Sequence, residues 1–367
     1  MINTLLSRLN FFTQYPAPPK YWKRMMKRAQ GNKTFISSSE AKKLGYSNIH
    51  FSWRGIGDQI LLLGAAEEYF NLTGEKLLLA VDEPEIFIGS TSCYVLTDYS
   101  PDSFWKEFNR SSKSDLLLKG GVFTLNFLNS GFYKNKTLIF PKVPMMGMLL
   151  KHLGISGRVN CSPSLHLSES EKRFGHFSNK QICVMTGGNV PYKILPFEIM
   201  QEVVNALNGE YLILQIGASK DKPLAGAENL CGISLRKSAA VLSASNAFVG
   251  TIGGLMHLAE SVGCPSVIAS GAEPDIYCKY TDHIHVKSNP YCKECEELGL
   301  NPLFDKCPNC YRCIREIKSI EIVQAIIKIL ENPIREKTFY EIKQADRING
   351  IDGLFPYLES PPAIRVL

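Results

Sequence analysis

Residues 249–274, VGTIGGLMHLAESVGCPSVIASGAEP, contain the pattern that decides the predicted fold. An apolar strand ends at residues 247–249, a glycine turn leads into a helix, and a second apolar strand follows over residues 265–269. Strand, turn, helix and strand in this order predict one unit of a parallel α/β sheet. Gly253 and Gly254 lie where the N-terminal N–H groups of the helix point outward, so the turn suits a phosphate group.

A histidine near the start of this helix supports the phosphate interpretation. A pair of glycines before a helix more often makes only a tight turn. His257, however, lies at the end of the helix that would face an anion. The alternative is a histidine that packs in the core or caps the helix. The sequence of the remaining chain is needed to choose between these two interpretations.

The composition is that of an ordinary globular chain of 367 residues, 45% hydrophobic and 21% charged, which is long enough for two domains. No apolar run approaches the roughly 20 residues of a membrane span. The N-terminus, MINTLLSRLNFF, lacks the apolar core and cleavage site of a signal peptide. We therefore expect a cytoplasmic location.

The net charge of +6 is concentrated near the N-terminus. Residues 1–47 hold one acid, Glu40, against nine basic residues: Arg8, Lys20, Lys23, Arg24, Lys27, Arg28, Lys33, Lys42 and Lys43. This basic extension is interpreted either as a solvated arm or homo-oligomer contact, or as a peripheral contact with the anionic inner membrane surface. The remaining chain has no basic stripe, so we expect no nucleic-acid partner.

Alternating strands, glycine turns and helices predict two Rossmann-like halves. The first half opens with a strand at residues 49–52, the turn Gly55-Ile56-Gly57 and a helix, followed by strands expected over residues 77–81, 115–118, 124–128 and 138–140. Residues 141–164 are interpreted as a helix and a linker. The second half is expected to contain the strand 181–186, the turn Gly187-Gly188-Asn189, the helix 196–207, the strand 211–215, the turn 217–221 and the helix 235–245.

These segments resemble glycosyltransferase family 9, the ADP-heptose:lipopolysaccharide heptosyltransferases. The resemblance covers about residues 48–330 and is carried by GIGD at 55–58, KILP at 193–196, GASKD at 217–221, GGLMHLAESVGCPSV at 253–267 and CIREI at 313–317. It implies the GT-B architecture, two facing Rossmann-like domains with a cleft between them. The domains expected are an extension (1–47), an acceptor domain (48–160), a nucleotide-sugar domain (161–330) and a tail (331–367).

The resemblance also implies roles for individual residues. Asp58 matches the general base that takes the proton of the acceptor hydroxyl, and a helix-capping role is its alternative. Lys193 matches the lysine that neutralises the diphosphate, Asp221 the acid that holds the ribose, and Ile233 the apolar residue against the base. The complete set of expected substrate-binding residues is Gly55, Gly57, Gly188, Asn189, Lys193, Gly217, Asp221, Ile233, Gly253, Gly254, Leu255, Met256 and His257.

One position departs from the family pattern. The family usually has an acid and then a hydroxyl residue before the glycine of the phosphate loop, and this chain has Ile252 and Gly253 there. Either the donor sugar differs, or hydroxyl recognition has moved elsewhere, or the protein binds nucleotide without transferring a sugar.

Five of the eleven cysteines form a cluster: Cys292, Cys295, Cys307, Cys310 and Cys313. Two Cys-x2-Cys pairs can surround one tetrahedral zinc or iron ion. Disulfides or free thiols are the alternatives, and a reducing compartment disfavours disulfides. Four thiolates leave no open coordination position, so we expect a structural ion and no catalytic metal. Spacing favours Cys310 as the fourth ligand, whereas the family resemblance favours Cys313.

The sequence therefore predicts an inverting glycosyltransferase. Its donor would be a nucleotide diphosphate sugar, ADP-heptose by resemblance, and its acceptor a hydroxyl of a cell-surface glycan of the lipopolysaccharide type or of a protein. The alternative is a nucleotide-sugar-binding or assembly protein that has a GT-B fold and no catalytic activity.

Overall fold

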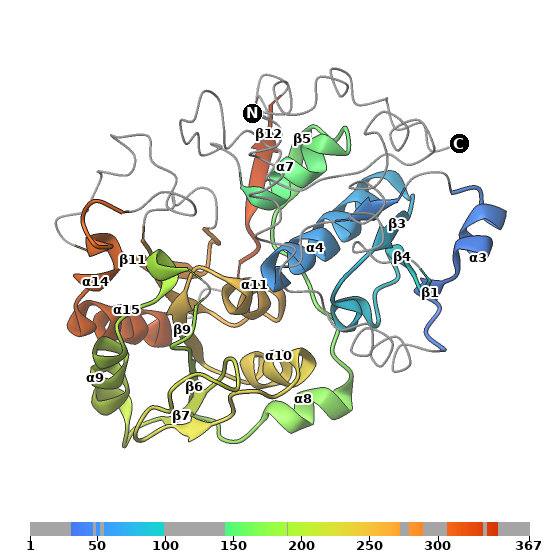
Figure 1. Ribbon diagram of the computed structural model, residues 1–367. Coiled ribbons are helices and arrows are strands. Elements are labelled where there is room, and N and C mark those ends of the chain that lie inside the picture. The colour runs from blue at the N-terminus through green and yellow to red at the C-terminus, as the bar shows by residue number, and fades with distance from the viewer. Residues whose placement is uncertain are drawn as a thin grey trace.

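The computed structural model describes residues 31–46, 49–51, 55–98, 144–188, 190–271, 279–288, 307–332 and 336–343. The chain forms two α/β halves that lie side by side, each built on a parallel sheet (Figure 1). This arrangement confirms the predicted fold class of two facing Rossmann-like domains.

The sheet of the first half has four parallel strands in the order β1-β4-β3-β2. Their bounds are Phe35–Ile36 for β1, His50–Phe51 for β2, Leu77–Ala80 for β3 and Cys93–Leu96 for β4. The strand β3 was expected, whereas β4 was not. The strands expected over residues 115–118, 124–128 and 138–140 lie outside the described residues.

The first sheet begins earlier in the chain than expected. Strand β1 lies within residues 1–47, which the sequence analysis assigns to a basic extension, and pairs Ile36 with Leu96 of β4. The helix α3 (Ser38–Lys43) follows it, with a capping box between Ser37 and Glu40. Ile36 and Ala41 of this segment form a small apolar cluster with Leu78 of β3 and Leu96 of β4. The charge of the neighbouring lysines and arginines therefore obscured a short strand.

Helix α4 (Ile56–Thr73) is the central helix of the first half. It begins after Gly55 and ends at Gly74, whose left-handed backbone (φ 76°) lets its N–H bond to the Phe70 carbonyl. Every residue from Gln59 to Ala66 is buried, as expected of a helix that is covered on all sides. Strands β3 and β4 pack on one side of it, and α7 (Met145–His152) and α11 of the second half pack on the others.

The second half contains six parallel strands in the order β11-β10-β9-β6-β7-β8. They are β6 (Gln181–Val184), β7 (Leu212–Gln215), β8 (Glu228–Asn229), β9 (Ala247–Thr251), β10 (Ser266–Ala269) and β11 (His283–Val286). The helical elements are α8 (Glu169–Gly175), η3 (Pro191–Lys193), α9 (Phe197–Leu207), α10 (Leu235–Ser243), α11 (Gly254–Ser261), α14 (Arg312–Arg315) and α15 (Ser319–Glu331). The predicted elements of this half are confirmed, with ends that differ by at most two residues.

The strand order reverses between β6 and β9. From β6 the chain proceeds outward to β7 and β8, and then returns to place β9 on the other side of β6. Loops that follow two such neighbouring strands diverge and leave a crevice at their carboxyl ends, which is where doubly wound sheets bind ligands. The turns after β6 and β9 are the two glycine turns of the second half.

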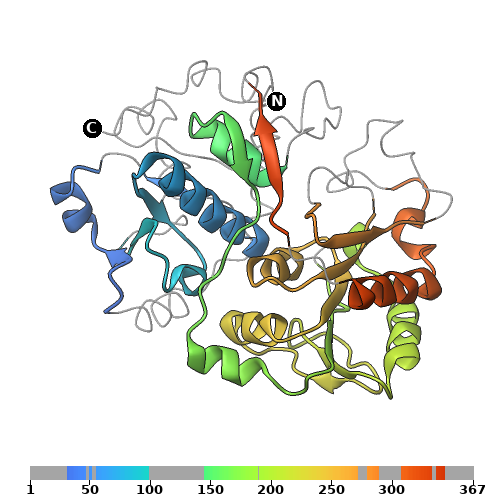
Figure 2. The same ribbon diagram turned by 180° about the vertical axis from the view of Figure 1, so that it is seen from behind.

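The end of the chain returns to the first half. Strand β12 (Phe339–Ile342) pairs antiparallel with β5 (Gly157–Asn160), beside α7 (Figure 2). Part of the expected tail, residues 331–367, is therefore an ordered strand. No helix among the described residues is both long enough and apolar enough to cross a membrane.

One hydrophobic core extends across both halves. Leu61 of α4, Met146 of α7 and Met256 of α11 all belong to it. A buried arginine adds a polar connection, because Arg236 of α10 donates to the carbonyl of Glu85 in η1 (Pro84–Phe87) at 2.9 Å. The described parts of the two halves thus share an extensive interface, which fixes the position of one set of glycine turns relative to the other.

The same arginine holds the segment that leads into the second sheet. Arg236 donates to the His166 carbonyl at 2.6 Å and to Glu171 Oε2 at 2.8 Å. Hydrogen bonding to the guanidinium lowers the pKa of the Glu171 carboxyl to about 2. The ion pair therefore stays charged at any pH at which the protein would be used.

Candidate active site

Two glycine turns, one from each half, meet where the N-termini of α4 and α11 face each other. A Cβ added to Gly254 would lie 3.0 Å from Ile56 Cβ, and a Cβ added to Gly57 would lie 2.7 Å from His257 Cδ2. A side chain at either position would need the opposite turn to move. The glycines therefore permit the close approach of the two helix ends.

His257 lies at the centre of this junction and is buried. Its Nδ1 is 2.7 Å from the hydroxyl of Tyr280, and its Nε2 faces Gly57. Burial, together with the positive charge of Lys193, lowers the pKa of the imidazole to about 3. At neutral pH His257 is uncharged, so it acts by hydrogen bonding and not as a cation.

The depressed pKa predicts how stability depends on pH. The unfolded chain binds a proton at His257 as the pH falls below about 6.5, whereas the folded chain does so only near pH 3. The stability that His257 contributes is therefore complete above pH 6.5 and is lost as the pH falls from 6.5 toward 3. We expect His257→Gln to have a shallower decline of melting temperature over this interval. Parallel declines in the two proteins would contradict the neutral, buried assignment.

Lys193 is fixed at the point where the strand order reverses. The hydroxyl of Thr251, at the end of β9, donates to the Lys193 carbonyl at 2.7 Å. A Cβ at Gly188, after β6, would lie 2.7 Å from the same oxygen. The backbone is thus held between both strand ends. The half-buried side chain stays close enough to His257 to lower its pKa.

Asp221 lies over the turns that follow β6 and β7. One carboxylate oxygen accepts the N–H of Ala218 at 2.9 Å, and its Oδ1 would be 2.7 Å from a Cβ at Gly187. The same carboxylate contacts the Cβ position of Gly217, whose φ of 156° also favours glycine. Asp221 therefore shapes the turn and is partly exposed at the carboxyl edge of the sheet.

Asp58 lies in the first turn of α4 and is half-buried. The residue at the helix N-cap, Gly55, offers no side chain to the free N–H groups, and the Asp58 carboxylate lies against it. This location suits a helix-capping carboxylate. It also places an ionisable oxygen beside Gly57, at the junction of the two turns, where an acceptor hydroxyl could reach it.

The remaining expected residues differ in their surroundings. Met256 is fully buried in the shared core, so its side chain packs against apolar residues instead of facing the junction. Ile233 and Leu255 are half-buried against the same core. A Cβ at Gly253 would meet no atom within 4 Å, so space is open above the loop. Asn189 lies outside the described residues.

Ile252, which replaces the family acid, is a core residue. Only 5% of its surface is exposed, and it belongs to the hydrophobic cluster that the two halves share. The isoleucine therefore turns inward, away from the open space above Gly253.

A small pocket opens beside His257 and is lined by residues of both halves. Leu61 of α4 and Met145 of α7 form its apolar wall, and Tyr280 and Lys279 supply polar groups. The pocket shows that the junction is not completely filled by side chains.

Three of the five clustered cysteines lie in the described part of the chain, and Cys292 and Cys295 lie outside it. Cys307 and Cys313 are buried, whereas Cys310 is exposed. The N–H of Tyr311 donates to Cys307 Sγ at 3.2 Å, and Cys310 and Tyr311 have left-handed backbones with φ of 49° and 63°. The N–H···S bond and the left-handed residues make a tight turn at residues 307–311.

The cysteine segment also supports the segment that carries Lys193. Helix α14 packs on η3. A Cβ at Gly271 would lie 3.5 Å from Cys313 Sγ and 2.5 Å from the carbonyl of Tyr192. The position of Cys313 is therefore coupled to the residue that precedes Lys193.

Sequence reasoning missed two partners at this site. Tyr280, which bonds to His257, lies 23 positions from it along the chain, and no local pattern connects the two residues. Thr251 was assigned only to the glycine turn, because the strand was expected to end at residue 249, although its hydroxyl anchors Lys193. A polar residue at the last position of a buried strand was the signal that could have identified it.

Comparison with known proteins supports the fold assignment. No protein-family model matches the sequence, and no curated protein matches it either. A glycosyl transferase family 9 protein from Veillonella parvula has a similar structure, with a TM-score of 0.56 and 16% identity over 78% of this chain and 98% of that one.

Two E. coli structures are similar to a comparable degree. The iron-containing dodecameric glycosyltransferase TibC gives a TM-score of 0.58 and 20% identity over 77% of this chain and 78% of its own. The ADP-heptose lipopolysaccharide heptosyltransferase II gives 0.55 and 13% over 78% and 99%. The chain therefore has the GT-B fold of the glycosyltransferase family 9 proteins and heptosyltransferases that it resembles.

Proposed function

We propose that this chain is an inverting glycosyltransferase that moves a sugar from a nucleoside diphosphate to a hydroxyl group. The observation that carries the proposal is the junction of the two glycine turns, at residues 55–58 and 253–257, beside Lys193 at the reversal of the strand order. TibC has also been observed in complex with ADP-D-β-D-heptose. By analogy, ADP-heptose is the proposed donor here.

The junction offers three kinds of group to a diphosphate. The N-terminus of α11 presents backbone N–H groups and the positive end of the helix dipole. Lys193 supplies a compact positive charge. His257, being neutral, can donate a hydrogen bond from Nε2 when the Tyr280 hydroxyl donates to Nδ1. Together these groups would stabilise the negative charge that the leaving nucleoside diphosphate acquires.

Asp58 is the proposed general base. It would take the proton of the acceptor hydroxyl while that oxygen attacks the anomeric carbon and the bond from this carbon to the diphosphate breaks. A single displacement of this kind inverts the configuration at the carbon. The proposed acceptor is a glycan of the lipopolysaccharide type or a protein, approached from the first half of the chain.

Thermal unfolding of the full chain with a series of nucleotides tests the proposal. A ligand that binds only the folded state at about 100 times its dissociation constant adds roughly 2.7 kcal/mol of stability. We expect ADP-heptose and ADP to raise the melting temperature and adenosine to raise it less. An unchanged melting temperature with every nucleoside diphosphate and nucleotide sugar would contradict the proposal.

Lys193→Ala is expected to weaken ADP binding much more than adenosine binding. The lost charge faces the diphosphate and not the base, and a hydrogen bond to a charged group contributes about 1.5–3 kcal/mol. Calorimetric titration with both ligands measures the difference. Lys220→Ala, which removes an exposed lysine from the turn after β7, is the matched control. Equal weakening of ADP and adenosine would place the Lys193 amine away from the phosphates.

A structural zinc or iron ion on the cysteine cluster forms a second part of the proposal. Left-handed backbone at two non-glycine residues is costly, about 1 kcal/mol or more each, and an ion that holds the thiolates of residues 307 and 310 would offset this cost. The N–H···S bond to Cys307 supports a thiolate at that position. TibC, a protein of similar fold, is iron-containing. The ion would hold the segment that supports Lys193 and would take no part in the reaction.

Changing Cys292 and Cys295 together to Ser is expected to release one ion per chain and to lower the stability of the second half. Thiolate coordination supplies folding free energy to a segment with little apolar content. Elemental analysis of protein prepared under reducing conditions provides the measurement, and Cys231→Ser is the matched control. Neither zinc nor iron in the wild-type protein would contradict the proposed ion.

The alternative function, nucleotide-sugar binding without transfer, is favoured by one observation. Ile252 turns into the core at the position where the family has an acid. Donor binding without turnover by the wild-type chain would support this alternative.

TibC is dodecameric, and we propose that this chain also forms a homo-oligomer in the cytoplasm, with the basic residues of its N-terminal segment available for contacts.

A further inference from the structure

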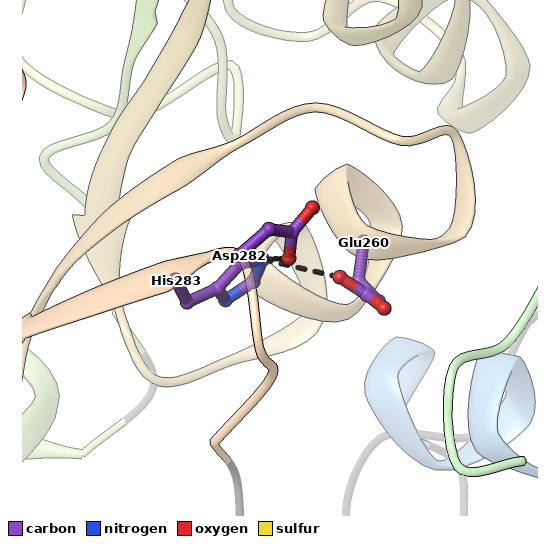
Figure 3. A group of neighbouring side chains, drawn as sticks. All are labelled: Glu260, Asp282 and His283. Carbon is purple, nitrogen blue, oxygen red and sulfur yellow. Dashed lines mark ion pairs between the residues drawn. The ribbon is translucent and has the colours of Figure 1, made fainter. Parts of the chain in front are cut away.

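One histidine and two acids form a buried group between the end of α11, the helix that carries His257, and the start of β11. Glu260 follows His257 by one turn of α11, and Asp282 and His283 stand where β11 begins (Figure 3). Their side chains are almost inaccessible, with 4%, 4% and 0% of their surfaces exposed. None of the three belongs to the nucleotide site or to the cysteine cluster.

The spacing of the three side chains is that of ligands around an ion. His283 Nε2 lies 3.5 Å from Glu260 Oε2 and 3.7 Å from Asp282 Oδ1, and one atom from each residue lies within 4.8 Å of the others. These separations are too long for good hydrogen bonds. Bonds of about 2.1 Å to a tetrahedral ion place ligand atoms about 3.4 Å apart.

The His283 side chain points into the group, and no hydrogen bond among the described residues explains its position. Neither ring nitrogen of His283 has a hydrogen-bond partner among the residues that the structure describes, and the same holds for Glu260 Oε2. Nearly all buried polar atoms in folded proteins are paired, so each exception needs an explanation. A cation shared between the imidazole and the carboxylates would satisfy these atoms at once.

The charges of the group also favour a cation. Burial, reinforced by the neighbouring Asp282, raises the pKa of Glu260 well above its usual range, and burial holds the pKa of His283 well below its usual value. Without a cation, Glu260 therefore keeps a proton at neutral pH. A divalent ion would displace this proton and compensate the two carboxylates, and the neutral imidazole would offer its lone pair.

We infer that Glu260, Asp282 and His283 bind a divalent first-row transition-metal ion, with zinc as the expected ion. One imidazole and two carboxylates suit zinc, and their burial in the interior marks the site as structural. The site joins the end of α11 to the start of β11, two elements that the cysteine cluster does not connect.

The ion would hold His257 in position through Tyr280. The Tyr280 ring lies 5.0 Å from the ring of His283, edge to face, and its hydroxyl contacts His257 Nδ1. Bound zinc would fix residues 280–283 against α11 and thereby fix the partner of His257. Glu260 and His283 are positioning residues in this sense and would not touch the substrate.

Elemental analysis of the full chain tests the inference. We expect wild-type protein, after incubation with Zn²⁺ and removal of excess ion, to hold one zinc that survives the combined Cys292→Ser and Cys295→Ser change. In that background Glu260→Gln and His283→Gln should each abolish this zinc, and the exposed control His176→Gln should retain it. Absence of zinc from the Cys292→Ser, Cys295→Ser background would overturn the inference, as would retention after either site substitution.

Zinc titration of the chain with the Cys292→Ser and Cys295→Ser changes serves as a second test if a site variant fails to fold. Binding should saturate at about one Zn²⁺ per chain and should weaken as the pH falls, because protons compete with the metal ion for its ligands. Chain that contains zinc should also melt at a higher temperature than chain treated with EDTA. No uptake of Zn²⁺ at pH 8 would overturn the inference, because the three side chains would then bind protons and no metal ion. This result would leave the proposed sugar transfer unaffected.

Discussion

The Asp58→Asn variant is expected to keep the stability of the wild-type chain and to lose sugar transfer by about a hundredfold or more. Asparagine has nearly the same shape as aspartate and is an equally good helix cap, so α4 should begin as before. An amide cannot accept the proton of the acceptor hydroxyl near neutral pH. The measurement is the rate of ADP formation from ADP-heptose with acceptor present, compared with the melting temperature.

Asp58→Ala separates the two roles of this residue. It removes both the base and the cap, so it should lose transfer to the same extent and also lower the melting temperature, with a loss of about 1 kcal/mol of stability. Unchanged transfer in Asp58→Asn, with only a stability loss in Asp58→Ala, would reduce Asp58 to a capping residue.

The Gly57→Ala variant is expected to disturb the junction itself. Its methyl group would lie 2.7 Å from His257 Cδ2, and the ring is buried and held by Tyr280. Overpacking of this kind costs roughly 1–3 kcal/mol. The displacement should also weaken ADP binding by about tenfold, because the ring and the N-terminus of α11 move together. Calorimetry and thermal unfolding measure the two effects.

Gly253→Ala is the matched control for the steric effect on stability. A Cβ at this position meets no atom within 4 Å, and a φ of 169° is extended backbone that any residue adopts. The control should therefore keep the wild-type melting temperature. Equal melting temperatures for Gly57→Ala and the wild type would show that the two turns are not in close contact.

The alternation of elements could be predicted from the sequence, because the central strands β6, β7, β9 and β10 are short, mostly apolar runs followed by turn residues. The glycine turns at residues 187–188 and 253–254 also stand out, since backbone turns at strand ends leave a local pattern. The strand order, with its reversal between β6 and β9, follows the general rule for doubly wound sheets. The central elements of the second half, from β6 to β10, were therefore predicted, whereas α8, β8, β11 and α15 were not.

The short strands of the first half could not be predicted in the same way. Strand β1 has two residues and stands among lysines, so its pairing with β4 depends on a contact between positions about 60 residues apart. A two-residue strand has no periodicity to detect. The neighbouring capping box, Ser37 with Glu40, was the local signal that the segment is structured.

Contacts between distant segments were likewise inaccessible to sequence reasoning. The Tyr280 hydroxyl against His257 and the buried group around His283 both depend on how β11 lies against α11. Arg236 lies between the halves and bonds to their carbonyls, which no local pattern indicates. Tertiary packing determines the environment of these residues and thereby their hydrogen-bond partners.

The most direct test of the proposed function is the release of ADP from ADP-heptose by the purified full-length chain, measured with glycan and protein acceptors present. The glycosyltransferase assignment predicts continuous ADP formation by the wild type, at a rate at least about a hundredfold above that of Asp58→Asn. Binding of ADP-heptose with no ADP formation above the Asp58→Asn level would contradict it, and would identify the chain as a nucleotide-sugar-binding protein.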